Sequence, residues 1–178
     1  DNMSIINGIR NPESFYIWGD SWSANFDFYN LWSANNSITG FNDNTVIKTV
    51  YDPSPVGFEM PASNAFTGFT NDGDNLYGAN NVNINTKLTN SDNQTYINNF
   101  GHNFWTNNSH IEIINFPASG FRFLKTGALE NVGRNGAYWS AIPNDKYTSC
   151  NLTFKWSSVT PIYTYQRSYG FAVRPVTE

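Results

Sequence analysis

The chain has 178 residues, of which 17% are aromatic and only 13% are charged. A disordered chain would carry few aromatic residues, so this composition indicates one folded domain with a sizeable core. The net charge of −4 and the pI near 5.0 give no support for binding to nucleic acid or to an anionic membrane surface.

Cys150 is the only cysteine in the sequence, so no internal disulfide can form. No apolar run approaches the roughly 18 residues that a spanning helix needs, which predicts no direct membrane insertion. No signal peptide is recognisable. Because the chain opens on Asp1 rather than on Met, removal of a leader or of a longer N-terminal region is one expectation.

Residues 1–50 carry clustered aromatic residues separated by Asn, Gly, Asp and Ser, which predicts short strands and loops. Residues 46–51 form a β-rich run that ends at two prolines, Pro53 and Pro55. We expect this N-terminal β-rich segment to belong to the same domain as residues 51–178. The aromatic residues here are interpreted as filling the space under loops, in preference to a sugar-stacking platform.

Residues 61–69 are the best candidate for a short helix. Ser63 is placed to cap it, Phe66 and Phe69 fall on one face, and Gly68 limits its length. Residues 70–110 are rich in Asn, Asp, Thr and Gly but carry spaced apolar residues, so we expect an ordered insertion with a strand around 82–84. Residues 111–116 then predict a strand that leads into Pro117.

The last third of the chain alternates apolar and polar residues at Leu152/Phe154 and at Phe171/Val173, as half-buried strands do. Glycines punctuate these predicted strands. Four motifs follow one another: Phe-Pro-Ala-Ser-Gly-Phe-Arg at 116–122, Gly-Ala-Leu-Glu-Asn-Val-Gly at 127–133, Gly-Ala-Tyr-Trp-Ser-Ala at 136–141, and Arg-Ser-Tyr-Gly-Phe-Ala-Val-Arg-Pro-Val at 167–176.

In this order the motifs resemble the C-terminal half of the Fibrobacter succinogenes major paralogous domain, which occurs in Bacteroidales surface proteins and their phages. The match is strong over roughly the last 60 residues and weaker at 51–58 and 64–69. The resemblance implies an α+β, C-type-lectin-like fold related to the formylglycine-generating enzyme, with short strands, one or two short helices and many long loops. The group of proteins that the chain resembles includes the variable proteins of diversity-generating retroelements, whose C-terminal segment is diversified for ligand binding.

The residues do not predict an active site. His102 and His110 are the only histidines, and neither has partners at the spacing of a zinc site. No Gly-x-Ser-x-Gly elbow occurs, and one cysteine cannot supply the pair that formylglycine-generating relatives use. The Glu-Pro-Asn and Trp-Asn-Asp tripeptides of calcium-dependent lectins are absent, and residues 72–75 are interpreted as a turn. We therefore predict no enzyme activity, no cofactor and no metal.

Two polar intervals, residues 144–153 and 160–169, mix Tyr, Ser, Thr and Ile without regard to burial. Each of these types is reachable from an Asn codon by changing its adenines, as adenine-directed diversification would do; Lys146, Lys155 and Gln166 do not fit. Tyrosine also offers a rigid contact with a polar tip, while Ser and Thr adapt. The alternative is that Tyr and Thr here reflect β-propensity at an exposed face.

We accordingly place a binding surface within residues 138–169, with Tyr138 and Trp139 straddling core and surface. Arg122, Arg167 and Arg174 are expected to tie loops together through backbone carbonyls or a carboxylate, and of these Arg167 alone is a candidate ligand contact. The predicted ligand-binding residues are Tyr138, Trp139, Asp145, Tyr147, Ser149, Asn151, Ile162, Tyr163, Thr164, Tyr165, Arg167, Ser168 and Tyr169.

The function expected from the resemblance is non-enzymatic binding of a protein or glycan receptor on a cell surface. The chain would act in a phage tail or on a bacterial surface, as a homo-oligomer. The alternative is a structural subunit or adhesin of a Bacteroidales surface appendage or lipoprotein layer, without diversification.

Overall fold

The computed structural model describes residues 10, 32–35, 40–69, 100–106, 109, 111–145 and 147–178. Within these residues the chain is mostly β-structure, as expected, with short strands, long loops and almost no helix. The strand predicted at 82–84 lies outside the described residues. In chain order the elements are β1 Phe58–Glu59, η1 Ser63–Phe66, β2 Gly101–Trp105, β3 Ile113–Pro117, β4 Phe121–Arg122, β5 Leu129–Glu130, β6 Asn135–Pro143, β7 Thr148–Lys155, β8 Ser158–Gln166, β9 Ala172–Val173 and β10 Val176–Thr177.

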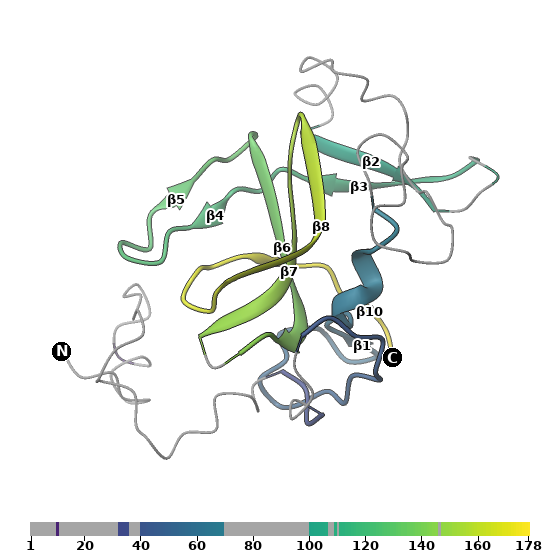
Figure 1. Ribbon diagram of the computed structural model, residues 1–178, viewed down its shortest axis with the longest axis vertical. Coiled ribbons are helices and arrows are strands. Elements are labelled where there is room, and N and C mark those ends of the chain that lie inside the picture. Colours follow the sequence, from purple (N-terminus) through teal and green to yellow (C-terminus); the bar gives the residue numbers. More distant parts are fainter. Residues whose placement is uncertain are drawn as a thin grey trace.

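The centre of the fold is a four-stranded sheet in the order β8-β7-β6-β9 (Figure 1). Strands β6, β7 and β8 follow one another as antiparallel neighbours, and β9 adds to β6 in parallel. Three two-stranded pairs surround it: β4 with β5 on one side of the long strands, β2 with β3 on the other, and β1 with β10 near the C-terminus. The strands predicted at 111–116 and around Leu152 and Phe154 are therefore confirmed as β3 and β7.

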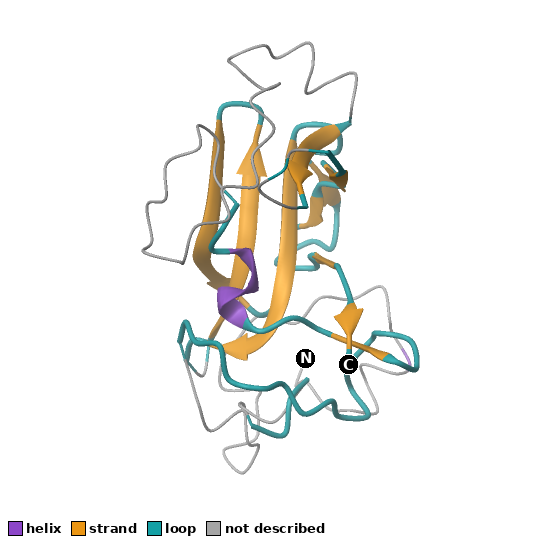
Figure 2. Cartoon of the chain, turned by 90° about the vertical axis from the view of Figure 1, so that its right-hand side faces the viewer, coloured by secondary structure: helices purple, strands orange, loops and turns teal. Residues whose placement is uncertain are grey.

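The first face of the sheet packs on an aromatic core. Tyr138 of β6 stacks with Phe154 of β7 at 6.0 Å between ring centroids, and η1 lies against the long strands above them (Figure 2). Phe69, just after η1, stacks on Phe104 of β2 at 4.4 Å. Burial of such rings supplies most of the stabilising free energy of a domain of this kind. The cluster comprises Phe66, Phe69, Phe104, Phe116, Ala118, Tyr138, Leu152 and Phe154.

Residues 46–51 do not form the predicted strand; of this run, one residue makes an isolated bridge, Lys48 with Ser33. The Lys48 ammonium instead donates hydrogen bonds to the carbonyls of Ser54, Pro55 and Phe58. The carboxylate of the buried Asp52 accepts hydrogen bonds from the amides of Ser54 and Met60, at 2.7 and 2.9 Å. These side chains stabilise a loop, so the β-propensity of the run is overridden.

The helix predicted at 61–69 is shorter and of a different type, because η1 is a four-residue 3-10 helix. Ser63 does not cap it. Its hydroxyl accepts a hydrogen bond from the amide of Asn42 at 2.8 Å and lies 3.1 Å from the carbonyl oxygen of Gly40, so it joins η1 to the preceding loop. Phe66 and Phe69 do enter the same core, 6.0 Å apart. Between residues 40 and 178, η1 is the one helix that the described residues contain. Their helix content is therefore lower than the predicted α+β class implies.

Three glycines of the motifs, Gly120, Gly127 and Gly133, adopt left-handed conformations. Gly120 has φ +69° and Gly133 has φ +73°, a region that L-residues rarely occupy. A Cβ atom on Gly120 would lie 2.3 Å from the carbonyl oxygen of Glu130, whereas one on Gly133 would meet nothing within 4 Å. The amide of Gly120 also donates to the carbonyl of Asn135 at 2.8 Å. Gly120 is thus required for the close approach of two chain segments, and Gly133 for its turn alone.

We expect Gly120→Ala to reduce the free energy of unfolding by more than about 2 kcal/mol, and Gly133→Ala by only about 1 kcal/mol. Both substitutions introduce the same backbone strain, but the first also forces apart residues 120 and 130. Urea denaturation of the two variants measures the difference. Equal losses would show that the contact with Glu130 is not tight.

His102 connects the β2–β3 pair to the central sheet. Its imidazole is fully buried, and Nε2 lies 2.9 Å from the carbonyl oxygen of Lys155 on β7. Burial lowers the pKa of His102 below its ordinary value of 6.5, against the smaller effect of the hydrogen bond to Lys155. His102 is therefore protonated at a lower pH in the folded state than in the unfolded state.

Stability should fall as the pH falls below about 6.5, because the unfolded state then binds more protons than the folded state. We expect the free energy of unfolding to decline less between pH 7 and pH 5.5 in His102→Asn than in the unchanged protein, whatever the variant's stability at pH 7. Denaturation curves at the two pH values measure this, with His110→Asn as the control. Parallel pH profiles for all three proteins would contradict the assignment.

Candidate functional site

Three of the predicted tyrosines meet at one place on the second face of the central sheet. The ring centroids of Tyr163 and Tyr165 are 5.1 Å apart, and those of Tyr165 and Tyr169 are 5.3 Å apart. All three line a single pocket of about 310 Å³. We call it the tyrosine-lined pocket. Its described lining consists of Phe121, Asn135, Gly136, Ala137, Thr153, Phe154, Lys155, Ser158, Thr160, Tyr163, Tyr165, Tyr169 and Phe171.

A β-bulge in β8 places side chains from both halves of this strand on the face that carries the pocket. Thr153 of β7 pairs with Thr160, but Asn151, two residues earlier, pairs with Tyr163, so β8 contains one extra residue. An extra residue reverses the alternation of side chains between the two faces. Tyr163 and Tyr165 therefore face the same side as Ser158 and Thr160, and all four line the pocket.

The tyrosines stand on aromatic side chains that belong to the core. Phe171 lies 5.3 Å from Tyr165 and 5.5 Å from Tyr169, and it stacks on the buried Trp139 at 4.3 Å. Tyr169 also contacts Phe121 of β4 at 5.7 Å. These contacts fix the orientation of the Tyr165 and Tyr169 rings, because each of the two has edge-on neighbours.

The three phenols differ in exposure, and the pKa values of two of them are raised. Tyr163 is 46% exposed, while Tyr165 and Tyr169 are half-buried. Burial raises the pKa of Tyr165, and the neighbouring phenols of Tyr163 and Tyr169 raise it further. Burial and then the Glu130 carboxylate raise the pKa of Tyr169. Both hydroxyls are therefore uncharged near neutral pH and can donate as well as accept hydrogen bonds.

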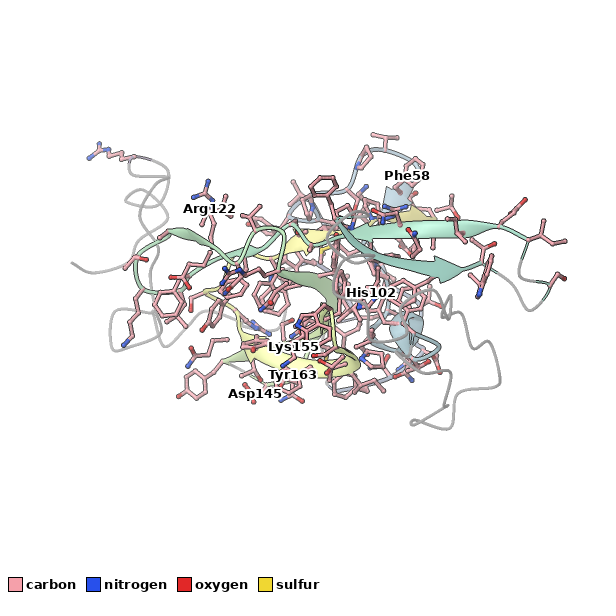
Figure 3. All side chains as sticks on the ribbon, turned by 90° about the horizontal axis from the view of Figure 1, so that it is seen from above. Phe58, His102, Arg122, Asp145, Lys155 and Tyr163 are labelled. Carbon is pink, nitrogen blue, oxygen red and sulfur yellow. The ribbon has the colours of Figure 1, made fainter. Side chains whose placement is uncertain are left out.

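The sequence did not single out the polar wall of the pocket. Asn135, Thr153, Ser158 and Thr160 come from three strands, and Lys155 is the one charged residue among the described residues of the lining. Lys155 pairs with Ser158 and Asn151 pairs with Tyr163, so Lys155 and Tyr163 lie towards different ends of the pocket; both are labelled in Figure 3, which looks along the long strands. Only the pairing register of β6, β7 and β8 brings these residues to one face, and no local motif signals that register.

Four predicted site residues lie inside the protein. Tyr138, Trp139, Ser149 and Asn151 are between 1% and 4% exposed, so none of them presents a surface to a partner. The hydroxyl of Tyr138 donates to the carbonyl of Pro117 at 2.7 Å, and that of Ser149 donates to the carbonyl of Ile142 at 3.0 Å. These residues are buried because strands β6 and β7 are central in the sheet and are covered on both faces. The prediction that the four side chains contact a ligand is therefore corrected.

Asp145 and Tyr147 occupy the turn between β6 and β7. The Asp145 carboxylate accepts hydrogen bonds from the amides of Tyr147 and Thr148, at 2.7 and 2.8 Å. Burial would raise the pKa of Asp145, but these bonds and those of the Thr148 and Asn144 side chains lower it on balance. Asp145 thus stabilises the turn, and Tyr147 is 44% exposed beyond it.

The remaining predicted residues do not line the pocket. Ile162 and Thr164 are half-buried on β8, and Arg167 and Ser168 lie in the turn that precedes Tyr169. The amide of Arg167 donates to the carbonyl of Tyr147 at 3.0 Å, which joins this turn to the β6–β7 turn. Two other predictions are confirmed, because Arg122 donates to the carbonyl of Gly127 at 2.9 Å and Arg174 to that of Asn115 at 3.4 Å.

The described lining of the pocket combines aromatic rings, hydroxyl groups, one amide side chain and one ammonium group. Its described lining contains no Asp, Glu, His or Cys, the side chains that most often serve as general acids, bases or metal ligands. Cys150 is fully buried, and burial raises its pKa to about 12. Among the described residues no three His, Cys, Asp or Glu side chains group together as a metal site would require.

Comparison with known proteins gives one match. Residues 89–176, just under half of the 178-residue chain, match the family described as a domain of unknown function, DUF8237. Neither the curated proteins nor the solved structures contain a match. No helix within the described residues is long and apolar enough to cross a membrane.

The turn assignment of Asp145 predicts the effects of two substitutions. Asp145→Ala should lower the free energy of unfolding by about 1–3 kcal/mol, because two backbone amides lose their acceptor. Asp145→Asn keeps an amide oxygen at that position and should lose less than half as much. Chemical denaturation at pH 7 measures both. An alanine variant as stable as the unchanged protein would show that the carboxylate does not stabilise the turn.

Proposed function

We propose that this chain is a non-enzymatic recognition domain that binds a receptor on a cell surface through the tyrosine-lined pocket and its rim. The observation that carries the proposal is the convergence of Tyr163, Tyr165 and Tyr169 on one pocket, with contacts of 5.1 and 5.3 Å between neighbouring rings. Tyrosine is enriched among residues that dominate binding free energy, and dense clusters of it mark recognition surfaces.

The rings are held in place before any partner arrives. Tyr165 and Tyr169 pack on Phe171, which is itself held by the buried Trp139. A side chain that is already ordered loses little entropy on binding, so more of its contact energy becomes affinity. Tyr163, at 46% exposed, is the member of the cluster most accessible to a partner.

The finer features of the proposal rest on the resemblance of the C-terminal motifs. We assign the chain a C-type-lectin-like fold and a place among the variable proteins of diversity-generating retroelements. Diversification would then act on accessible positions, of which Tyr147 and Tyr163 are 44% and 46% exposed. Ser149, Cys150 and Asn151 are buried in β7, where frequent substitution would damage the sheet, so we leave them out of the variable set.

The receptor would be a protein or a glycan, and the chain would act as a homo-oligomer in a phage tail or on a bacterial surface. A nearby reverse transcriptase gene, with an imperfect repeat of the segment encoding residues 138–176 that differs at adenines, would support the diversified form. Lack of such a repeat would favour the undiversified adhesin or structural subunit.

Tyr163→Ala should reduce binding to receptor-bearing cells by about 30-fold, the effect of losing a contact worth about 2 kcal/mol. The melting temperature should change little, because the ring is half exposed. Flow cytometry of labelled protein on a panel of Bacteroidales strains measures the binding, and thermal denaturation measures the stability.

Tyr51→Ala provides the matched control, since Tyr51 is 62% exposed and does not line the pocket. Its binding should equal that of the unchanged protein. Equal binding by Tyr163→Ala would contradict the proposal. Self-assembly that Tyr163→Ala abolishes, with no cell binding by any variant, would identify the structural subunit instead.

A further inference from the structure

The wall of the tyrosine-lined pocket carries hydroxyl side chains from β7 and β8. No side-chain hydrogen bond joins Thr153, Ser158 or Thr160 to another described residue, although all three line the pocket. Each hydroxyl can donate one hydrogen bond and accept two. The pocket therefore presents several hydrogen-bonding groups next to the aromatic rings, and a ligand that fills it has to satisfy them or leave them solvated.

The pocket also carries a positive charge. The Lys155 side chain makes no ion pair with a described residue, and no carboxylate is among the described residues of the lining. Glu130 acts on Tyr169 from outside the lining, and the phenols of Tyr165 and Tyr169 are uncharged near neutral pH. A ligand with one anionic group is thus complementary to the end of the pocket at Lys155.

The volume limits the size of the ligand. At about 310 Å³ the pocket is at the lower end of the range of about 300–1,000 Å³ that small-ligand sites occupy. This space suits one ring or a short chain of rings. Tyr163 and Tyr165 offer apolar ring surface for such a ligand, and the hydroxyls of Thr153 and Thr160 stand on the neighbouring strands.

We infer that the pocket binds an acidic monosaccharide unit of a glycan, a uronic or sialic acid, with its carboxylate on Lys155. The C–H face of the sugar ring packs on Tyr163 and Tyr165, and its hydroxyl groups bond to Thr153, Ser158 and Thr160. A peptide carboxylate would satisfy the ammonium but not the several hydroxyls. The inference rests on the proposed function, for which it names the class of receptor as an acidic glycan.

A matched pair of probes tests the charge. Methyl β-D-glucuronide and methyl β-D-glucoside share one ring and differ in the carboxylate, and sialyllactose with lactose forms a second pair. NMR titration of the intact protein should show binding about tenfold tighter for the acidic member of at least one pair, as expected for one charge-assisted hydrogen bond. Lys155→Gln should abolish this preference, so that the acidic and the neutral member of the pair bind with similar affinities.

Two further variants serve as controls. One removes a positive charge outside the pocket, and the other removes a hydroxyl group inside it. Lys125→Gln removes an exposed lysine that does not line the pocket, and it should keep the tenfold preference. Thr153→Val removes one hydroxyl at similar volume and should weaken both members of the bound pair about equally, by about fivefold. Thermal denaturation confirms that each variant is folded.

The outcomes distinguish this inference from the proposed function. No preference for an acidic sugar in either pair, or a preference that survives Lys155→Gln, overturns the acidic-glycan assignment. If Tyr163→Ala still abolishes cell binding in that case, the recognition function stands with another receptor. If the acidic preference depends on Lys155 while Tyr163→Ala leaves cell binding intact, the pocket is a sugar site and the proposed cell-binding surface lies elsewhere.

Discussion

The stack of Trp139 on Phe171 connects the core of this protein to its candidate binding surface. The two rings are 4.3 Å apart, Trp139 is 3% exposed, and Phe171 also contacts Tyr165 and Tyr169 at the pocket. Rings that pack on a buried neighbour hold one orientation because any rotation would open a void. Hydrophobic burial therefore positions Tyr165 and Tyr169, because both pack on Phe171, which packs on the core.

The scarcity of charge has a related consequence. Only 13% of the residues are charged, and the described lining of the pocket contains a single one, Lys155, among aromatic and hydroxyl side chains. A lone ammonium without a competing carboxylate exerts its full effect on a ligand, whereas a paired one is largely neutralised. Selectivity for charge and selectivity for shape are thus assigned to different residues of the same pocket.

Two polar side chains satisfy backbone groups of the loop around residues 52–60. Asp52 satisfies the amides of Ser54 and Met60, and Lys48 satisfies the carbonyls of Ser54, Pro55 and Phe58. Because buried backbone groups must be paired, these loops have one low-energy arrangement despite having no regular structure. This explains how the described part of the chain, which contains almost no helix, keeps a defined frame for its central sheet.

The amino-acid sequence alone determined the β-rich, loop-rich character, the strands at β3 and β7 and the dense occurrence of tyrosines after residue 160, because composition, alternation and turn residues are local properties. The left-handed Gly120 and Gly133 also belong to motifs visible in the sequence. Only the tertiary structure decided which side chains share the pocket. The extra residue of β8 reverses its alternation, and the central position of β6 and β7 buries residues that looked exposed. Strand register and sheet order depend on contacts between distant segments, which no local pattern encodes.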